Sequence, residues 1–164
     1  MRRRDKELTD PGDALDVLAR GDVLRLAMIA DGAPYVVPLS FVAVAGGDAS
    51  SPLAGLRLWV HSALEGRKVA ALRKDPRVCF EVTVDVAVVP AARACDVTLR
   101  YRSVIGEGRA AFLEDPAAKV RALEAITARY AAGAPVSAAE AARVAIIEIA
   151  VDSLSCKASP PTGR

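Results

Sequence analysis

The sequence predicts a mainly β protein, a six-stranded antiparallel β-barrel with helices at its periphery. Six runs of mostly β-branched and large apolar residues follow one another, separated by turn clusters rich in glycine, proline and aspartate. One segment with helical signals precedes the runs, and three more lie between them at wide and irregular intervals. This order favours hairpin-linked strands in a barrel over a doubly wound parallel sheet.

Length and composition set the domain organisation. The chain has 164 residues, of which 52% are hydrophobic, which is enough to bury one core without disulfides or a metal. We expect a single domain over residues 1–156 and a flexible C-terminal tail over 157–164.

Charge and cysteine content exclude several classes of protein. The 22 basic and 20 acidic residues leave a net charge of only +2, so we expect no general binding to nucleic acid or to a membrane surface. No apolar segment follows the basic start MRRRDK, and we expect neither a signal peptide nor a membrane span. Cys79, Cys95 and Cys156 are far apart and read as free thiols in a cytoplasmic protein. With one histidine and no paired cysteines, no metal site is predicted.

The six predicted strands alternate with turn signals such as DGAP and GGDASSP. They cover residues 22–30, 34–45, 56–61, 77–89, 97–113 and 143–151. The second run contains Pro38, which has no N–H to donate to a neighbouring strand. Pro38 therefore marks an edge, a bulge or a break.

The helices are predicted from their caps. Asp10 as N-cap, Pro11 at the first helical position and Gly21 as a stop define a helix over 11–20. Asp115 and Pro116 begin a helix over 116–131, and Ser137 with Glu140 form a capping box for a short helix over 137–142.

The stretch WVHSALEGRKVAALRKDP, residues 59–76, contains the only histidine of the chain. Ser62 and Glu65 have the spacing of a capping box, which predicts that the strand ending at His61 turns directly into a helix over 63–74. The N-terminus of such a helix attracts anions, because its first amide groups lack partners within the helix.

Lys68 is predicted to point inward on this helix. A rotation of about 100° per residue puts it inside the apolar arc made by Leu64, Val69 and Leu72. A partly buried ammonium needs a compensating anion. Arg67 lies beside it and Gly66 removes a side chain near the entry, so the group suits a phosphate.

A second interpretation of the same residues is purely structural. Ser62 would then be only a cap, Glu65 would pair with Lys68 three residues later, and His61 would be a hydrogen-bonded residue at a strand end.

The other motifs in the sequence are weaker evidence for a function. The glycine pattern GEGRAA at 106–111 is not followed by a helix, so it is no dinucleotide fingerprint. In VTLRYRSV, Arg100 and Arg102 share one strand face, where they would meet a flavin, a substrate or a partner subunit, or lie on a solvated outer face. The few aromatic residues do not alternate with basic ones, which leaves no platform for stacking bases.

Three blocks in this order, PYVVPLSF (34–41), VHSALEGRKVAALRKDPRVCFEV (60–82) and RYRSVIGEGRA (100–110), resemble the pyridoxamine 5′-phosphate oxidase-related FMN-binding split-barrel family. The likeness is greatest to its Nim-type branch of 5-nitroimidazole-resistance proteins and covers residues 5–150. The resemblance implies a six-stranded antiparallel Greek-key split barrel that forms a homodimer, with two FMN molecules in clefts between the protomers.

The resemblance also implies a set of site residues. The segment 37–40 would lie beside the flavin ring, residues 61–68 at the phosphate end, and 102–103 on a neighbouring strand. The implied cofactor-binding residues are Val37, Pro38, Leu39, Ser40, His61, Ser62, Ala63, Gly66, Arg67, Lys68, Arg102 and Ser103.

Two positions depart from the family pattern. Ser40 stands where the branch usually has asparagine, which removes an amide from the ring contacts. Glu107 stands where an aromatic residue is common, and an acid near the ring disfavours the anionic reduced flavin. Related split barrels hold the deazaflavin F420 or haem, so these cofactors are the alternatives to FMN.

The sequence thus predicts a cytoplasmic flavoprotein that passes reducing equivalents to a small oxidised organic molecule, a nitroaromatic compound among the candidates. The flavin would supply the chemistry and the protein its position and electrostatics. His61 is the one candidate catalytic residue, either donating to the phosphate or giving a proton to the substrate. The alternatives are a non-catalytic module for haem, F420 or another phosphorylated cofactor, and a structural dimer without a ligand.

Overall fold

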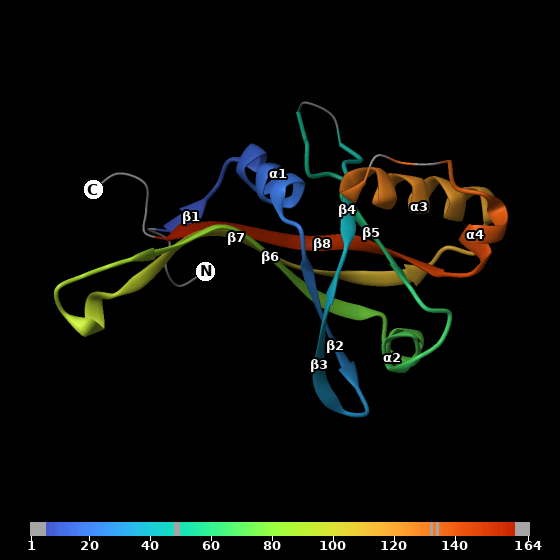
Figure 1. The fold of residues 1–164 in the computed structure, drawn as a ribbon, viewed down its shortest axis with the longest axis horizontal. Helices are drawn as coiled ribbons and strands as arrows, with labels where there is room; N and C mark the ends of the chain where they lie inside the picture. Colours follow the sequence, from blue (N-terminus) through green and yellow to red (C-terminus); the bar gives the residue numbers. More distant parts are fainter. Residues whose placement is uncertain (1–5, 48–49, 132, 134, 160–164) are drawn as a thin grey trace.

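One antiparallel sheet with peripheral helices forms the structure, a computed structural model that describes residues 6–47, 50–131, 133 and 135–159 (Figure 1). The strands are β1 (Glu7–Leu8), β2 (Leu24–Ala30), β3 (Ala33–Leu39), β4 (Phe41–Val44), β5 (Arg57–Ser62), β6 (Arg77–Val89), β7 (Thr98–Phe112) and β8 (Ala145–Ser159). The helices are α1 (Pro11–Arg20), α2 (Arg67–Lys74), α3 (Pro116–Tyr130) and α4 (Ala138–Ala142), and a 3₁₀ turn, η2, lies at Ala94–Asp96.

The sheet curls into a split barrel. Its strand order is β3-β2-β6-β7-β8-β5-β4, with β1 added beside β8. The two strands at the ends of this path, β3 and β4, are consecutive in the chain with only Ser40 between them. The chain therefore crosses at Ser40 from one edge of the sheet to the other, and the sheet does not close by strand pairing. The predicted fold class is confirmed.

In the part of the chain that the structure describes, the sheet has eight strands where the sequence predicted six. The run over 34–45 forms both β3 and β4, and it divides at Ser40, while Pro38 lies inside β3 opposite Arg25. Because β3 is an edge strand, the missing N–H of Pro38 costs no sheet hydrogen bond, so the edge alternative holds. The other additional strand, β1, has two residues and is too short to show the alternation of apolar and polar residues that predicts a strand.

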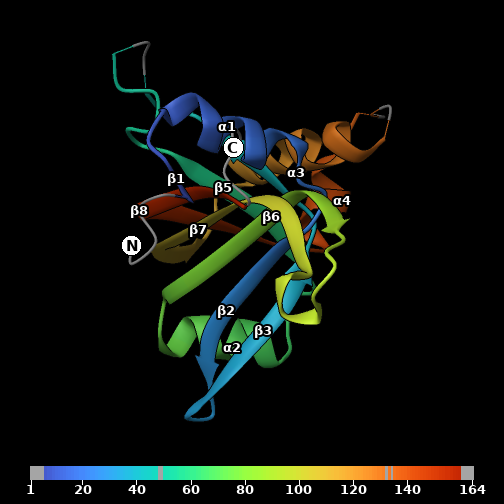
Figure 2. The same ribbon diagram turned by 90° about the vertical axis from the view of Figure 1, so that its left-hand side faces the viewer.

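Three helices form where their caps predicted them. The Asp10 carboxylate accepts a hydrogen bond from the amide of Gly12 at 2.8 Å, and Asp115 accepts one from Ala118 at 2.7 Å. Ser137 and Glu140 form the complete capping box of α4. α1 and α3 cover one side of the barrel. α2 lies away from them, beside the part of the β2–β3 hairpin that carries its turn (Figures 1 and 2).

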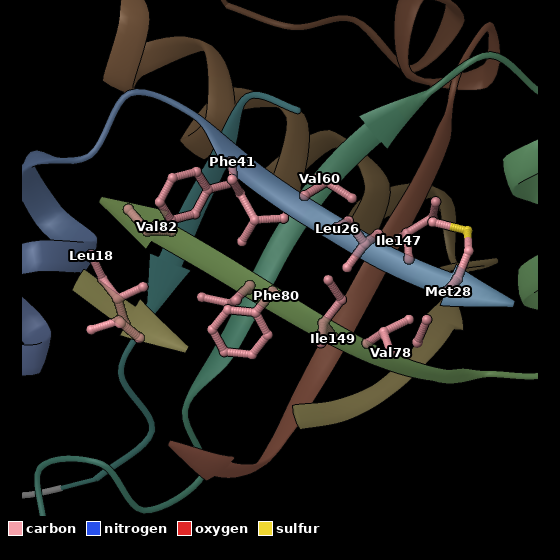
Figure 3. Packing of buried hydrophobic residues seen from close by; sticks show 14 of the residues in the cluster. Leu18, Leu26, Met28, Phe41, Val60, Val78, Phe80, Val82, Ile147 and Ile149 are labelled. Atoms are coloured by element: carbon pink, nitrogen blue, oxygen red, sulfur yellow. The ribbon is translucent and has the colours of Figure 1, made fainter. Parts of the chain in front are cut away.

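The barrel interior is apolar and tightly packed. Phe41, Val60 and Phe80 from separate strands meet in it, and Leu18 of α1 packs at its side (Figure 3). A Cβ at Gly106 of β7 would lie 2.3 Å from the Phe80 ring, so only glycine leaves room for that ring beside the strand. GEGRAA is thus part of a strand, as the missing helix signal indicated.

The C-terminal boundary differs from the prediction. Lys157–Ser159, expected to begin a flexible tail, are the last residues of β8, and Ser159 is buried opposite Tyr101. The strand continues because β7 is long enough to pair with it. The remainder of the expected tail, residues 160–164, lies outside the described part of the chain.

The β6–β7 hairpin extends beyond the barrel. A bulge with Asp85 at φ 59 precedes its outer part, residues 86–99, which we name the arm. The arm projects from the body as a two-stranded ribbon (Figure 1). No helix in the described residues is both long and apolar enough to cross a membrane.

Candidate functional site

The ends of β3, β4 and β5 bring two of the predicted segments together. β4 pairs with β5 so that Phe41 lies opposite Val60. Ser40 precedes Phe41 and His61 follows Val60, so both lie at the same end of this strand pair. The segment 37–40 therefore reaches the start of the histidine-containing stretch.

The helix after β5 begins later than predicted. Ser62 remains in β5, opposite Ala145 of β8, because the sheet hydrogen bonds keep its backbone extended. The N-cap of α2 is Gly66, at φ 127, so the predicted capping box of Ser62 and Glu65 is wrong. Gly66 has no side chain that could accept a hydrogen bond from the first amide groups of α2. The N-terminus of this helix is therefore open to an anion.

His61 carries an unsatisfied polar atom. Its Nδ1 is buried and has no hydrogen-bond partner among the described residues. Burial and, secondly, the Lys68 ammonium lower the pKa of His61. The hydrogen-bonded strand-end residue of the structural interpretation is not what is observed, since a buried ring nitrogen without a partner is costly.

Lys68 is half-buried, as its inward angle predicted, and burial lowers its pKa. Val69 and Leu72 of the same helix are buried beside it, but Leu64 lies before α2 and is 50% exposed. The described residues give Lys68 no carboxylate partner, and the expected alternative pairing with Glu65 is absent. A desolvated ammonium and a desolvated imidazole thus share one region with no anion between them.

Arg67 is directed to the β2–β3 hairpin. Its guanidinium stacks over the Tyr35 ring at 4.5 Å, and its Nε donates to the Asp31 carboxylate at 3.2 Å. This side chain is about half exposed, and it joins the start of α2 to the hairpin. Sequence spacing did not indicate Tyr35 or Asp31, because both lie more than thirty residues from Arg67.

Arg102 is not brought to the other predicted residues. It donates to Asp16 at 2.7 Å and to Asp13 at 3.2 Å, both on α1, and Asp85 lies 3.8 Å away. Its strand, β7, pairs with β6 and β8 in the sheet, and a contact of Arg102 with a cofactor stays a prediction. Ser103 is 3% exposed, and a contact of Ser103 with a cofactor stays a prediction. Arg102 is also no solvated surface residue, being only 23% exposed.

Glu107 lies on the outer face of the sheet, opposite Cys79 of β6. Both line a hollow of about 500 Å³ between β2, β6 and β7, whose apolar side includes Ile29 and Pro34. Burial and then the Glu107 carboxylate raise the pKa of Cys79. Among the described residues, no three histidines, cysteines or acids are grouped so that they could hold a metal ion.

The end of α3 holds the Ser40 corner, a contribution that the sequence analysis missed. The Tyr130 hydroxyl accepts a hydrogen bond from the amide of Phe41 at 2.8 Å. Arg129 stacks over the Phe41 ring at 4.3 Å and donates to the carbonyl groups of Leu18 and Ala19 at the end of α1. The corner between β3 and β4 is thus fixed from outside the barrel.

Comparison with known families returns a match along nearly the whole chain. The family model described as "Pyridoxamine 5′-phosphate oxidase" matches residues 10–158. No curated protein matches the chain.

Solved structures share the fold. A candidate 5-nitroimidazole antibiotic resistance protein from Bacteroides thetaiotaomicron is 23% identical, with a TM-score of 0.75 over 93% of this chain and 86% of that one. The flavocytochrome Anf3 from Azotobacter vinelandii is 24% identical, with a TM-score of 0.79 over 100% and 75%. An FAD and haem binding protein from Mycobacterium smegmatis is 25% identical, with a TM-score of 0.79 over 97% and 77%.

Proposed function

This chain belongs to the pyridoxamine 5′-phosphate oxidase family, and on that premise we propose that it is a flavoprotein that binds FMN and passes reducing equivalents to a small oxidised organic acceptor. The observation that carries the proposal is the uncompensated pair formed by His61 and Lys68. We name these two side chains, together with the N-terminus of α2, the anion site.

The anion site fits the phosphate of FMN. The buried Nδ1 of His61 has no partner, the half-buried Lys68 has no carboxylate, and Gly66 leaves the helix amides uncapped. Each feature is unfavourable alone and becomes favourable when an anion with several acceptor oxygens binds.

The edge of β3 fits the flavin ring. β3 pairs only with β2 in the described part of the chain, so the backbone groups along its other edge have no strand partner. The rim of a flavin ring carries hydrogen-bonding nitrogen and oxygen atoms that such an edge can meet. Tyr130 and Arg129 keep the end of this edge in place through Phe41.

When bound, FMN would supply the electron-transfer chemistry. The residues of this chain then bind and orient: Lys68 and His61 hold the phosphate, and the segment 37–40 fixes the ring. A nitroaromatic compound is one candidate acceptor, supported by the fold shared with the candidate resistance protein from Bacteroides. We assign His61 to the phosphate and not to the acceptor, because Lys68 is the charge that acts on it.

The exposed apolar surface supports a homodimer. Val86, Val88, Val97 and Leu99 of the arm are between 45% and 67% exposed, and Ile105 on the same strand as Leu99 is 42% exposed. An isolated two-stranded ribbon is at best marginally stable in water. A second copy of the chain that covers the arm and the outer sheet face removes this cost.

Point substitutions test the role of the arm in the dimer. Val88→Glu combined with Leu99→Glu places two charges on the arm, and we expect light scattering at micromolar concentration to show a monomer. Val23→Glu, at a 39% exposed position away from the arm, should leave the dimer intact. A variant with both arm charges that stays dimeric would remove the arm from the interface.

Haem is the second candidate ligand. The solved structures of similar fold include a flavocytochrome and an FAD and haem binding protein, and His61 is the only histidine that this chain could offer to haem iron. Under this alternative His61 would be the residue that holds the haem iron, and Lys68 would meet a haem carboxylate.

The absorbance spectrum of the purified protein separates these candidates. The proposal predicts flavin bands in the visible range that disappear on reduction. A Soret band without flavin bands would favour haem. If the protein gains neither spectrum after incubation with FMN or with haem, both candidates are wrong.

A further inference from the structure

The Ser40 corner, where β3 ends at Leu39 and β4 begins at Phe41, is held by a side chain of α3. β4 is an end strand of the sheet and pairs only with β5 in the described part of the chain, with Phe41 opposite Val60. The amide and the carbonyl group of the fully buried Phe41 both bind the Tyr130 hydroxyl. This hydroxyl thus supplies hydrogen bonds that a neighbouring strand would otherwise provide.

The same hydroxyl also binds the chain that enters β2. Its oxygen lies 2.8 Å from the Phe41 amide, which donates to it, and 3.0 Å from the carbonyl oxygens of Phe41 and Asp22. Asp22 comes just before β2, whose first residue, Leu24, is the strand partner of Leu39 at the end of β3. The hydroxyl therefore bridges the two chain segments just beyond this terminal pair, at the point where β3 leaves β2.

Arg129 connects the corner to the end of α1. Its guanidinium stacks over the Phe41 ring at 4.3 Å. It also donates to the carbonyl groups of Leu18 at 2.8 Å, of Ala19 at 3.1 Å and of Gly21. The last carbonyl groups of a helix have no partners within it, so they are free to accept these hydrogen bonds. Two consecutive residues of α3 thus join the end of α1, the start of β2 and the corner.

We propose that Tyr130 is a positioning residue for the flavin ring: its hydroxyl determines where the Ser40 corner lies, and thereby how tightly the ring, and not the phosphate, is bound. This inference rests on the proposed function, in which the segment 37–40 meets the ring. Tyr130 acts through the backbone of Phe41 and not by contact with the flavin.

The position of the corner matters because backbone groups bind a ring most tightly when they are already in place. A site that is ordered before its ligand arrives loses less conformational entropy on binding. Ser40 is the single residue between β3 and β4, so a displacement of Phe41 also displaces Ser40. Without the Tyr130 hydroxyl, the buried amide of Phe41 loses its partner, and the corner loses its fixed position.

Amide hydrogen exchange in the ligand-free protein tests the hold on the corner without any cofactor. Tyr130→Phe removes the hydroxyl and keeps the ring, and we expect the Phe41 amide to exchange about tenfold faster in this variant. Thr127→Val is the matched control, because it removes a hydroxyl from the same helix whose hydrogen bond, at 3.1 Å, goes to the carbonyl of Glu124 within α3. This control should leave the exchange of the Phe41 amide unchanged.

Titrations with FMN and with riboflavin test the role in ring binding. Riboflavin has the same ring without the phosphate, so Tyr130→Phe should weaken both ligands by the same factor, about threefold to tenfold. The ratio of the two affinities should keep its wild-type value, and Thr127→Val should bind both ligands as wild type does. Arg129→Gln keeps the hydroxyl but loses the stacking on Phe41. It should weaken both ligands in the same way, and it replaces Tyr130→Phe if that variant does not fold.

The outcomes separate this inference from the proposed function. If the Phe41 amide exchanges at the wild-type rate in Tyr130→Phe, or if the variant has a lower Tm but binds both flavins as wild type does, the inference is overturned. A loss of FMN affinity without a loss of riboflavin affinity would also overturn it, because Tyr130 would then act on the phosphate. If wild type binds neither flavin, the proposed function fails and the ring role of Tyr130 fails with it. Faster exchange in Tyr130→Phe would in that case still show that the hydroxyl fixes the corner.

Discussion

Arg102 and Lys68 are two partly buried cations, and the family resemblance assigned both to one cofactor. The chain surrounds Arg102 with the carboxylates of Asp13, Asp16 and Asp85. It gives Lys68 no carboxylate among the described residues, and adds the desolvated His61 nearby. One cation is neutralised within the fold, and the other is not.

The difference distinguishes a structural cation from a binding cation. Arg102 joins α1 to the β6–β7 hairpin, so its charge stabilises the fold. A desolvated charge without a partner lowers the stability of the fold. Such a charge indicates a binding site, where a ligand of opposite charge neutralises it. Substitution of the two cations should therefore have opposite effects on the ligand-free protein.

Lys68→Met should have the largest effect of these substitutions, a loss of FMN affinity. Loss of one charge-assisted contact of about 1.5–3 kcal/mol should weaken FMN binding tenfold or more. The same change removes a desolvated charge, so Tm of the ligand-free protein should stay the same or rise. Flavin fluorescence titration and thermal unfolding measure both quantities, with Lys74→Met as the control. A fall in Tm together with unchanged FMN affinity would make Lys68 a structural residue.

Arg102→Met should behave in the reverse manner. It leaves Asp13 and Asp16 without their partner, and we expect Tm to fall by roughly 2–4 °C, as for a loss of about 1 kcal/mol in a chain of this size. FMN affinity per folded protein should not change. The exposed Arg100→Met on the same strand is the control. Weaker FMN binding with an unchanged Tm would mean that Arg102 is a cofactor-binding residue and not a structural one.

Acid pH should remove the stabilisation by Arg102. Hydrogen bonds from Arg20 and the nearby charge of Arg102 lower the pKa of Asp85 below 3.8, its unfolded value. A carboxyl group with a lowered pKa contributes stability above the unfolded value and loses it as the pH falls through the folded one. The difference in Tm between wild type and Arg102→Met should thus be constant from pH 7 to 5 and shrink below pH 3.8. A difference that persists at pH 2.5 would mean that packing, and not charge, is lost.

Substitution of His61 should cause the smallest change in the stability of the ligand-free protein. The pKa of His61 is lowered from 6.5 by burial and by Lys68, so the unfolded chain binds this proton more readily. The ligand-free protein should therefore lose some free energy of unfolding as the pH falls from 6.5 through the folded pKa. His61→Gln should not show this loss. Equal pH profiles of the two proteins would show that His61 is not desolvated in solution.

Local signals allowed much of the fold to be predicted from the sequence. Asp10 with Pro11 and Ser137 with Glu140 act within a few residues of each other, and the helices they begin are confirmed. Ser62 and Glu65 match the same pattern but do not cap a helix, because pairing with β8, more than eighty residues away, keeps Ser62 in a strand.

Only the part of the candidate site that depends on local spacing could be predicted from the sequence. The inward angle of Lys68 follows from helical spacing within α2. Two of the partners of Arg102, Asp16 and Asp13, lie on α1, 86 and 89 residues away, and the Asp31 partner of Arg67 is 36 residues away. Local sequence patterns contain no information on such distant contacts.

The central claim is that the anion site formed by His61, Lys68 and the start of α2 binds the phosphate of FMN. Parallel titrations of the ligand-free protein with FMN and with riboflavin, followed by flavin fluorescence, test it most directly. The two ligands share the ring and differ only in the phosphate. The account predicts that FMN binds at least tenfold more tightly, and equal affinity for FMN and riboflavin would contradict it.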